Sequence, residues 1–314
     1  MTATAKIWML HLGVLLALVA AQLLLPPYYA NQLARIMVLA IFAMGYNISY
    51  GYTGLLSLGH ALFFTVGMYG AGLAILQVEW TFFPALIIGA VAGGISAAAV
   101  GLLALRTTGV SFMIVTLMFA QAGYLTILYF GSFTGGDEGF VVESVGRQVF
   151  GYDLAQDTPR AAMAFVLFAG AILAKLWLVR SPFGRVIVAM RENEDRSRML
   201  GYNPFRVKLI VLVISGLYAG VAGAAYGILF GYVGASFATV QYSILPLLYT
   251  LMGGVGTILG PLLGTLVMFT LVEIASIVIS QHLLVVGVAL VGLVLFAPRG
   301  ILGGVRERWL RWLP

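Results

Sequence analysis

The sequence contains no cysteine and few charged residues. Without cysteine, its 314 residues can form no disulfide, thiolate metal site or cysteine nucleophile. The three histidines, His11, His60 and His282, are too far apart in sequence to indicate a metal site. Charged residues make up 9% of the chain, against about a quarter in soluble domains, and the mean hydropathy is +1.04. These values exclude an ordinary soluble domain.

Motifs of soluble enzymes are lacking as well. No G-x-x-x-x-G-K-[ST] phosphate loop is present, so the chain is not expected to bind ATP by that route. Gly254, Gly256 and Gly260 faintly imitate a dinucleotide fingerprint, but no strand precedes them. We therefore predict that the chain is not an enzyme and has no catalytic residue, no metal site and no cofactor of its own. The net charge of +6 follows from basic loops retained on the cytoplasmic side and does not indicate nucleic-acid binding.

Apolar runs of about 18 or more residues recur along the chain, and each is long enough to cross a bilayer as a helix. The runs are continuous rather than alternating, which argues against β-barrel strands. We predict an all-α, polytopic integral membrane bundle that forms one transmembrane domain over residues 1–314. Its ten predicted spans cover residues 7–25, 33–50, 55–77, 82–105, 109–130, 161–179, 208–230, 242–260, 261–281 and 283–298.

The distribution of charge orients these spans. With a cytoplasmic N-terminus, the basic segments 180–207 and 299–314 and the residue Arg106 fall on the cytoplasmic side. The loop 131–160, in which acidic residues outnumber basic ones, falls on the outer side. This arrangement satisfies the positive-inside rule and places both termini in the cytoplasm.

Two glycine-rich segments interrupt the predicted third and eighth spans. Ten spans divide into two halves of five, which would be inverted relative to each other, and these two spans then occupy equivalent positions. Interrupted helices at matching positions of inverted repeats indicate a translocation site. For His60, a packed or hydrogen-bonding role is favoured over lining a pathway. The hypothetical substrate pathway comprises Gly51, Tyr52, Thr53, Gly54, Ser57, His60, Gly253, Gly254, Gly256 and Thr257.

One stretch, residues 181–208, concentrates charge between two apolar runs. Asn193 is expected to cap a short helix there, with Glu194 and Asp195 in its first turn and Gly201 just beyond its end. A loop that only fixes topology needs a few basic residues, not a capped helix with apolar contacts. We interpret the stretch as a docking element for a soluble partner. Eight of the 17 basic residues lie in or beside it: Lys175, Arg180, Arg185, Arg191, Arg196, Arg198, Arg206 and Lys208.

Glu273 is the acidic residue placed well inside a predicted span. It is either a structural acid, protonated or paired with a polar neighbour, or part of a proton relay. The structural interpretation is favoured because a relay normally needs further titratable groups at similar depth. Glycine ladders at four-residue spacing predict close helix packing within the chain, in preference to a subunit interface. They are formed by Gly89, Gly93, Ala97 and Gly101, and by Gly223, Gly227 and Gly231.

Several motifs along the chain form a recognisable set. They are Gly51-Tyr-Thr-Gly54 with Ser57-Leu-Gly-His-Ala61, Thr134-Gly-Gly-Asp-Glu-Gly139, Ser181-Pro-Phe-Gly-Arg185, Arg191-Glu-Asn-Glu194 with Leu200-Gly201, Gly253-Gly-Val-Gly-Thr257 with Gly260-Pro261, and Pro298-Arg-Gly-Ile-Leu302. The set resembles the permease subunits of ABC importers for branched-chain amino acids, specifically the LivM-type subunit. Two departures are Leu55, where the family commonly has Gln, and Asp195-Arg196-Ser197, where its loop motif has Glu-Ala-Ala.

The resemblance implies a mechanism divided among several chains in a bacterial inner membrane, surrounded by lipid. The partners would be a homologous second permease, two cytoplasmic ATPases that bind ATP-Mg, and a periplasmic substrate-binding protein. The expected ATPase contacts are Arg191, Glu192, Glu194, Asp195, Arg198, Met199, Leu200 and Gly201, which would form a coupling helix. The outer turn Thr134–Gly139 would supply the binding-protein contacts Gly135, Gly136, Asp137 and Glu138.

The resemblance predicts ATP-driven import of branched-chain or related small amino acids. Urea, short amides and aromatic acids are the alternative solutes, because similar permeases handle them. Outside the family, an ion-coupled secondary transporter energised through Glu273 is a weaker alternative. An intramembrane enzyme is disfavoured by the lack of cysteine, paired histidines or clustered acids. The sequence does not name the solute, because the binding protein sets most of the selectivity in such systems.

Overall fold

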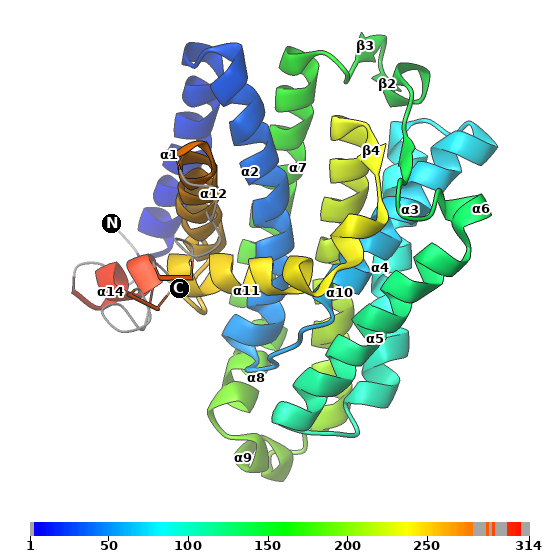
Figure 1. The fold of residues 1–314 in the computed structure, drawn as a ribbon. Helices are drawn as coiled ribbons and strands as arrows, with labels where there is room; N and C mark the ends of the chain where they lie inside the picture. The colour runs from blue at the N-terminus through cyan, green and yellow to red at the C-terminus, as the bar shows by residue number, and fades with distance from the viewer. Residues whose placement is uncertain (1–2, 279–286, 289–290, 293–299, 309–314) are drawn as a thin grey trace.

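Long apolar helices run side by side through the protein (Figure 1). The structure is a computed structural model, and it describes residues 3–278, 287–288, 291–292 and 300–308. Seven of the described helices are long and apolar enough to cross a membrane. They are α1 (Ala3–Leu24), α2 (Pro27–Tyr46), α3 (His60–Val78), α4 (Phe82–Ala104), α5 (Val110–Tyr129), α7 (Asp157–Arg180) and α10 (Pro204–Phe230). The chain is therefore an all-α, multi-pass membrane protein, as predicted.

Shorter elements connect these helices. Between α5 and α7 lie α6 (Gly131–Thr134), β1 (Phe140–Val141), η2 (Ser144–Arg147), β2 (Gln148–Val149) and β3 (Tyr152–Asp153). Between α7 and α10 lie α8 (Pro182–Glu192) and α9 (Glu194–Met199). The remainder comprises η1 (Asn47–Tyr52), β4 (Tyr232–Val233), η3 (Ala235–Ala238), α11 (Val240–Gly253), α12 (Gly260–Val278) and α14 (Gly300–Arg308). Two small antiparallel ladders pair β1 with β4 and β2 with β3.

Helix α7 joins two polar segments that lie at opposite ends of the bundle (Figure 1). The end that carries β2 and β3 is called the outer end here, and the end that carries α8 and α9 the inner end, after the sides that the charge distribution predicts. The loop after α4, which contains Arg106, lies at the inner end, because residues 107–109 line one cavity together with residues 190–194. The basic segments Arg106 and 180–207 thus share an end, as predicted.

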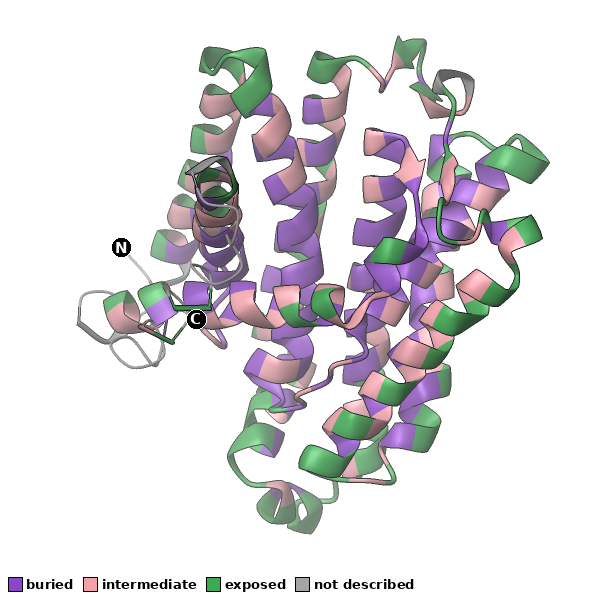
Figure 2. Ribbon diagram, viewed as in Figure 1, coloured by how far each residue is buried: buried purple, intermediate pink, exposed green. Residues whose placement is uncertain are grey.

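Helices α2 and α10 carry many of the buried residues of the bundle, whereas α1 and α5 are largely exposed (Figure 2). Glycines allow the central helices to approach closely. A Cβ atom added at Gly93 of α4 would lie only 2.6 Å from the Cα atom of Gly220 and from the carbonyl oxygen of Gly216, both in α10. A Cβ atom at Gly227 would lie 3.0 Å from the Met68 side chain in α3. The glycine ladders therefore pack helices within this chain, as predicted.

The boundaries of three predicted spans are wrong. The second begins at Pro27 rather than residue 33. The third begins at His60 rather than residue 55, because residues 53–59 are irregular. The eighth, predicted over 242–260, is represented by α11, which ends at Gly253. At 1.5 Å per residue α11 extends roughly 21 Å, short of the roughly 30 Å of a bilayer core, and it runs across the other helices in Figure 1. The glycine-rich breaks therefore lie between helices rather than within membrane-crossing helices.

The C-terminal part of the chain departs from prediction in one respect. Of the segment expected as a tail over 299–314, residues 300–308 form α14, which packs on α11. Gly300 has φ +70°, and a Cβ atom there would lie 2.7 Å from the backbone of Gly254. The predicted tenth span, 283–298, lies largely outside the described residues, as do residue 299 and residues 309–314.

Candidate functional site

The two glycine-rich segments meet in the folded protein. The Asn47 side chain joins them: its Nδ2 donates to the Thr257 carbonyl at 2.7 Å, and its Oδ1 accepts the Gly256 backbone N–H at 2.9 Å. Asn47 is fully buried. Gly51 packs against the backbone of Gly256. A Cβ atom added to Gly51 would lie only 2.7 Å from the Gly256 nitrogen. Segments about 200 residues apart therefore form one junction, which we call the glycine junction (Asn47–Gly54 with Gly253–Thr257).

The first side of the junction is a π-helical turn, η1, that continues α2 to Tyr52. Turns of this type are rare and occur frequently at functional sites. The chain then leaves the helix through Gly54, whose φ of +78° is unfavourable for other residues. The Thr53 hydroxyl donates to the Ile48 carbonyl at 3.2 Å, which satisfies one of the carbonyls at the end of the helix.

The second side of the junction separates α11 from α12. Gly254 and Gly256 have φ values of +128° and +71°, so glycine is required at both positions. The Thr257 hydroxyl donates to the Gly254 carbonyl at 2.8 Å and accepts the Gly260 N–H at 3.1 Å. Thr257 thus fixes the turn and also satisfies a backbone donor at the start of α12.

His60 holds helices together from a fully buried position. Its Nε2 lies 2.7 Å from the Ser215 Oγ of α10 and 3.4 Å from the Ser49 Oγ. Ser215 in turn donates to the Gly45 carbonyl at 2.7 Å. Ser57, also fully buried, accepts the Gly59 N–H at 3.1 Å. These contacts favour the packed, hydrogen-bonding interpretation of His60.

A cavity of about 500 Å³ opens beside the junction at the inner end. Its walls are residues 53–56, the loop between α4 and α5, and residues 190–194. Leu55, the departure from the family motif, is one of these wall residues. Of the predicted pathway residues, Thr53 and Gly54 line this cavity, whereas Ser57 and His60 are packed away from it.

Lys175 is a residue whose importance sequence reasoning missed. Its ammonium group lies 3.2 Å from the Thr257 carbonyl oxygen and 3.4 Å from that of Ile258. The same group is 5.6 Å from the centroid of the Tyr52 ring, and Lys175 is fully buried. The lysine therefore touches both sides of the junction. Its position inside the otherwise apolar run 161–179 is the signal in the sequence that could have revealed it. Its closeness to the charged stretch 181–208 hides that signal.

The charged stretch 181–208 contains two capped helices. The Ser181 Oγ accepts the Gly184 N–H at 3.1 Å at the start of α8. The Asn193 Oδ1 accepts the Arg196 N–H at 2.9 Å at the start of α9. The predicted cap of α9 is therefore correct, and α8 is an additional helix that the prediction did not separate.

Helix α9 is held at both ends. Glu194 lies 3.8 Å from the Arg198 guanidinium and 2.5 Å from the Lys208 ammonium group. Beyond the helix, Gly201 (φ +90°) donates to the Arg198 carbonyl at 3.0 Å, and Tyr202 donates to the Ser197 carbonyl at 3.2 Å. This pattern is a Schellman motif with glycine in the left-handed position, as the sequence predicted for Gly201.

Apolar side chains at the tip of this loop face outward. Met199 is 86% exposed and Leu200 is 76% exposed. Glu192 and Asp195 are exposed beside them. Arg191 also has an exposed side chain, but its guanidinium reaches back and donates to the carbonyl of Gly51. The loop thus offers an exposed apolar tip at one end and a contact with the glycine junction at the other.

The outer turn is built around glycines with positive φ. Gly135, Gly136 and Gly139 have φ values of +77°, +57° and +68°. The turn is closed by a hydrogen bond from the Gly139 N–H to the Gly135 carbonyl at 3.1 Å. Asp137 and Glu138 are exposed at its tip. The turn therefore presents two carboxylates outward, remote from the junction.

Glu273 lies on α12 and contacts α2. Its Oε1 accepts the Tyr28 hydroxyl at 2.5 Å and also the Gln32 side-chain amide. The acid therefore has polar neighbours in the bundle, which favours its structural interpretation. Among the residues that the structure describes, no group of three histidine, aspartate or glutamate side chains could hold a metal ion.

The chain is similar in sequence to known membrane proteins. Residues 28–297 match the family described as branched-chain amino acid transport system / permease component. The chain is 28% identical over 301 residues to the high-affinity branched-chain amino acid transport system permease protein LivM of Salmonella typhimurium, covering 87% of this chain and 69% of that protein. It is 26% identical to LivH of the same organism (84% and 91% covered) and 25% identical to BraD of Pseudomonas aeruginosa (88% and 96% covered). No solved structure matches the chain.

Proposed function

The chain belongs to the family of branched-chain amino acid transport system permease components, and on that premise we propose that it is one membrane subunit of an ATP-driven importer for branched-chain or related small amino acids. Such a subunit provides the passage and leaves ATP hydrolysis to other chains. ATP-Mg would be bound by two partner ATPases. In this proposal the complex lies in a bacterial inner membrane.

A single contact carries the mechanical part of the proposal: Arg191 of α8 donates to the Gly51 carbonyl in the glycine junction. A soluble partner that pulls on α8 and α9 would therefore act directly on the place where the two glycine-rich segments meet. Non-helical, glycine-rich backbone between apolar helices is typical of translocation sites. The cavity beside the junction, lined by residues 53–56 of the first segment and by residues 190–194, fits an inner mouth of the passage.

The exposed tip of the charged loop suits an ATPase contact. Met199 and Leu200 provide apolar area, and the capped helix α9 holds them in a fixed orientation. Charged residues around them, such as Asp195 and Arg198, would select the partner. Movement of the docked ATPases on ATP binding would then be transmitted through α8.

Two further partners complete the proposal. Relatives of the chain include proteins named LivM and LivH, each a permease of a branched-chain system, and we infer that this chain pairs with a homologous second permease. A periplasmic binding protein would deliver the solute at the outer end, where Asp137 and Glu138 are exposed. Urea, short amides and aromatic acids remain alternative solutes.

An ion-coupled secondary transporter is the rival from another class. It would need Glu273 to load and release a proton. The hydrogen bonds from Tyr28 and Gln32 instead give Glu273 a local structural role. Among the seven described helices that are long and apolar enough to span, the only acidic residue is Asp157 in the first turn of α7.

The proposal is tested by reconstituting this chain with its neighbouring permease, ATPases and binding protein in proteoliposomes. We expect uptake of radiolabelled leucine to require the binding protein outside and hydrolysable ATP inside. A complex whose ATPases carry an inactivated phosphate loop is the matched control, and it should take up none. Uptake driven by a proton gradient without ATP would overturn the proposal.

A further inference from the structure

Two arginine side chains lie against the same aromatic ring at the outer end of the bundle. The Arg35 Cζ is 5.0 Å from the centroid of the Phe230 ring, and the Arg160 Cζ is 5.9 Å from it. Arg35 belongs to α2, Phe230 ends α10, and Arg160 lies in the first turn of α7. Three helices from different parts of the chain therefore converge on this ring.

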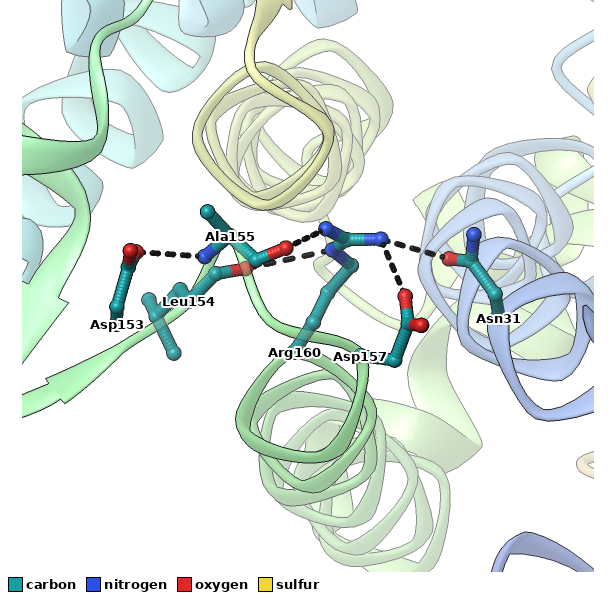
Figure 3. A network of polar contacts seen from close by, with 6 residues as sticks. All are labelled: Asn31, Asp153, Leu154, Ala155, Asp157 and Arg160. Carbon is teal, nitrogen blue, oxygen red and sulfur yellow. Dashed lines mark hydrogen bonds and ion pairs between the residues drawn. The ribbon is translucent and has the colours of Figure 1, made fainter. Parts of the chain in front are cut away.

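The hydrogen-bonding capacity of Arg160 is used within the protein (Figure 3). Its Nη1 donates to the Asn31 Oδ1 at 3.2 Å and to the Asp157 Oδ1 at 3.1 Å. Its Nε donates to the Leu154 carbonyl at 3.3 Å, and its Nη2 donates to the Ala155 carbonyl. Arg160 thus ties the outer loop to α2 and has a carboxylate partner, so its role is structural.

Arg35 has no such partners. Its Nε is buried without a hydrogen bond, and the side chain makes no hydrogen bond or ion pair with any residue that the structure describes. It lies inside the span Pro27–Tyr52, eight residues or about 12 Å beyond its start. Its guanidinium nevertheless reaches the outer end, because it shares the Phe230 ring with Arg160 from the first turn of α7. A half-buried charge without a partner is costly. Two positive charges thus lie beside one ring, and only Arg160 has a carboxylate partner among the described residues, so the free guanidinium of Arg35 favours an anion from outside the described chain.

Aromatic side chains form a wall beside this guanidinium. The Tyr226 ring is 4.8 Å from that of Phe230 and 5.3 Å from that of Phe237, and Phe237 is 4.8 Å from Tyr242. Arg35 lies over the Phe230 ring, which in turn contacts the Tyr226 ring. Arg35, Tyr226, Phe230 and Tyr242 are each half-buried, so all four keep accessible surface. An apolar wall with a few polar groups is typical of a small-molecule site.

We propose that Arg35 binds the α-carboxylate of the transported amino acid, an inference that rests on the proposed function. The apolar side chain of the solute then lies against Tyr226, Phe230 and Tyr242. The planar guanidinium matches a carboxylate with two parallel hydrogen bonds. The tyrosine hydroxyls and ring faces suit the α-ammonium group of the same solute. Urea and neutral amides lack the carboxylate, so the site selects amino and other organic acids over them.

Transport by variants gives the first test. In the reconstituted complex, Arg35→Gln should lower leucine uptake about tenfold or more, since a charge-assisted bond to the solute is lost. Arg35→Lys should retain part of the uptake, because the charge remains. Lys6→Gln, which removes a positive charge from an exposed position of α1, is the matched control and should leave uptake unchanged. Normal uptake by Arg35→Gln overturns this inference but leaves the proposed function intact.

Chemical protection of the unaltered complex gives a second test that does not depend on folding of a variant. Phenylglyoxal modifies arginine, and mass spectrometry measures modification at Arg35. We expect L-leucine to protect Arg35 and L-leucinamide, which lacks the carboxylate, to leave it reactive. If Arg35 is shielded in the assembled complex and leucine changes nothing, a carboxylate of the second permease or a lipid phosphate occupies it, and the inference fails. Equal protection by the amide also overturns it.

Discussion

The Arg191 guanidinium, in the last turn of α8, donates a hydrogen bond to the Gly51 carbonyl in the π-helical turn that ends α2. The bond joins residues 140 positions apart in sequence. Gly51 in turn lies against Gly256 on the other side of the glycine junction. The charged loop is therefore one hydrogen bond away from the place where the two broken segments meet, and no further element is needed to carry a movement between them.

The first prediction concerns this bond. Arg191→Ala removes the donor and leaves the Gly51 carbonyl without that charge-assisted bond, which is worth about 1.5–3 kcal/mol. In the reconstituted complex we expect ATP hydrolysis to continue while leucine uptake falls about tenfold. The readout is the number of leucine molecules moved per ATP hydrolysed. Arg185→Ala, at an exposed arginine of the same helix, is the control, and it should keep the wild-type ratio.

A parallel loss of ATP hydrolysis and uptake in Arg191→Ala would contradict transmission through this bond. It would show that the arginine is needed for docking instead. Arg191→Lys separates the effect of charge from that of geometry, because lysine keeps the positive charge but differs from arginine in reach and shape.

Gly201 gives the second prediction. Its φ of +90° costs other residues about 1–2 kcal/mol, and its N–H closes the Schellman motif on the Arg198 carbonyl. Gly201→Pro removes this donor and cannot adopt the angle. We expect solute-stimulated ATP hydrolysis to be abolished while the membrane bundle stays folded, as judged by size-exclusion chromatography. Gly170→Ala, in a helix interior with open space around it, should behave like wild type.

Local patterns in the sequence were sufficient for much of this architecture. Apolar run length predicted ten spans, seven of which correspond to described helices long enough to cross a membrane, and the identities of Asn193 and Gly201 predicted both ends of α9. These features depend on interactions within a few residues, so they can be read without knowing the fold. The orientation of α11 could not be read in this way, because an apolar helix of 14 residues has the same composition whether it crosses the membrane or lies across other helices.

The features that the sequence did not predict depend on contacts between residues far apart in the chain. An amide inside an apolar run marks Asn47 as unusual. Nothing near it in the sequence indicates that this amide meets Gly256 and Thr257. Lys175 looked like the start of a basic loop, and only the fold shows that it is buried. For Arg35 the decisive property is a missing partner within the described chain, which no sequence pattern states.

Asn47 gives the third prediction, which concerns stability. Asn47→Leu has a similar volume but leaves the buried Gly256 N–H unpaired and leaves the Thr257 carbonyl with only its longer contact to Lys175. Each unpaired buried group costs about 1–3 kcal/mol, so the free energy of unfolding should fall by at least that amount. Thermal unfolding of the purified protein in detergent measures the loss. Gln77→Leu, at an exposed amide near the end of α3, should leave Tm unchanged; an equal Tm for both variants would exclude a structural role for the Asn47 bridge.

Lys175 gives the fourth prediction, where two effects oppose each other. Lys175→Met removes donors to two carbonyls, but those contacts are long, at 3.2 and 3.4 Å. Burying an ammonium group without a counter-ion costs several kcal/mol, about as much or more than such bonds return. We therefore expect Lys175→Met to unfold at the same or a higher temperature than wild type and yet to transport less, because the junction loses a contact with both of its sides. A clear fall in Tm would show that the lysine is mainly a structural tie.

Glu273 gives the last prediction and separates the two transport classes. In Glu273→Gln the side-chain carbonyl oxygen can still accept the bonds from Tyr28 and Gln32, so the contact between α12 and α2 should persist. The variant cannot release a proton. We therefore expect its ATP-driven leucine uptake to equal that of wild type and to show the same dependence on pH. Glu273→Leu removes the acceptor as well and should lower Tm by leaving Gln32 without this partner. If Glu273→Gln abolishes uptake while keeping its Tm, the acid takes part in proton transfer and the secondary-transport alternative is favoured.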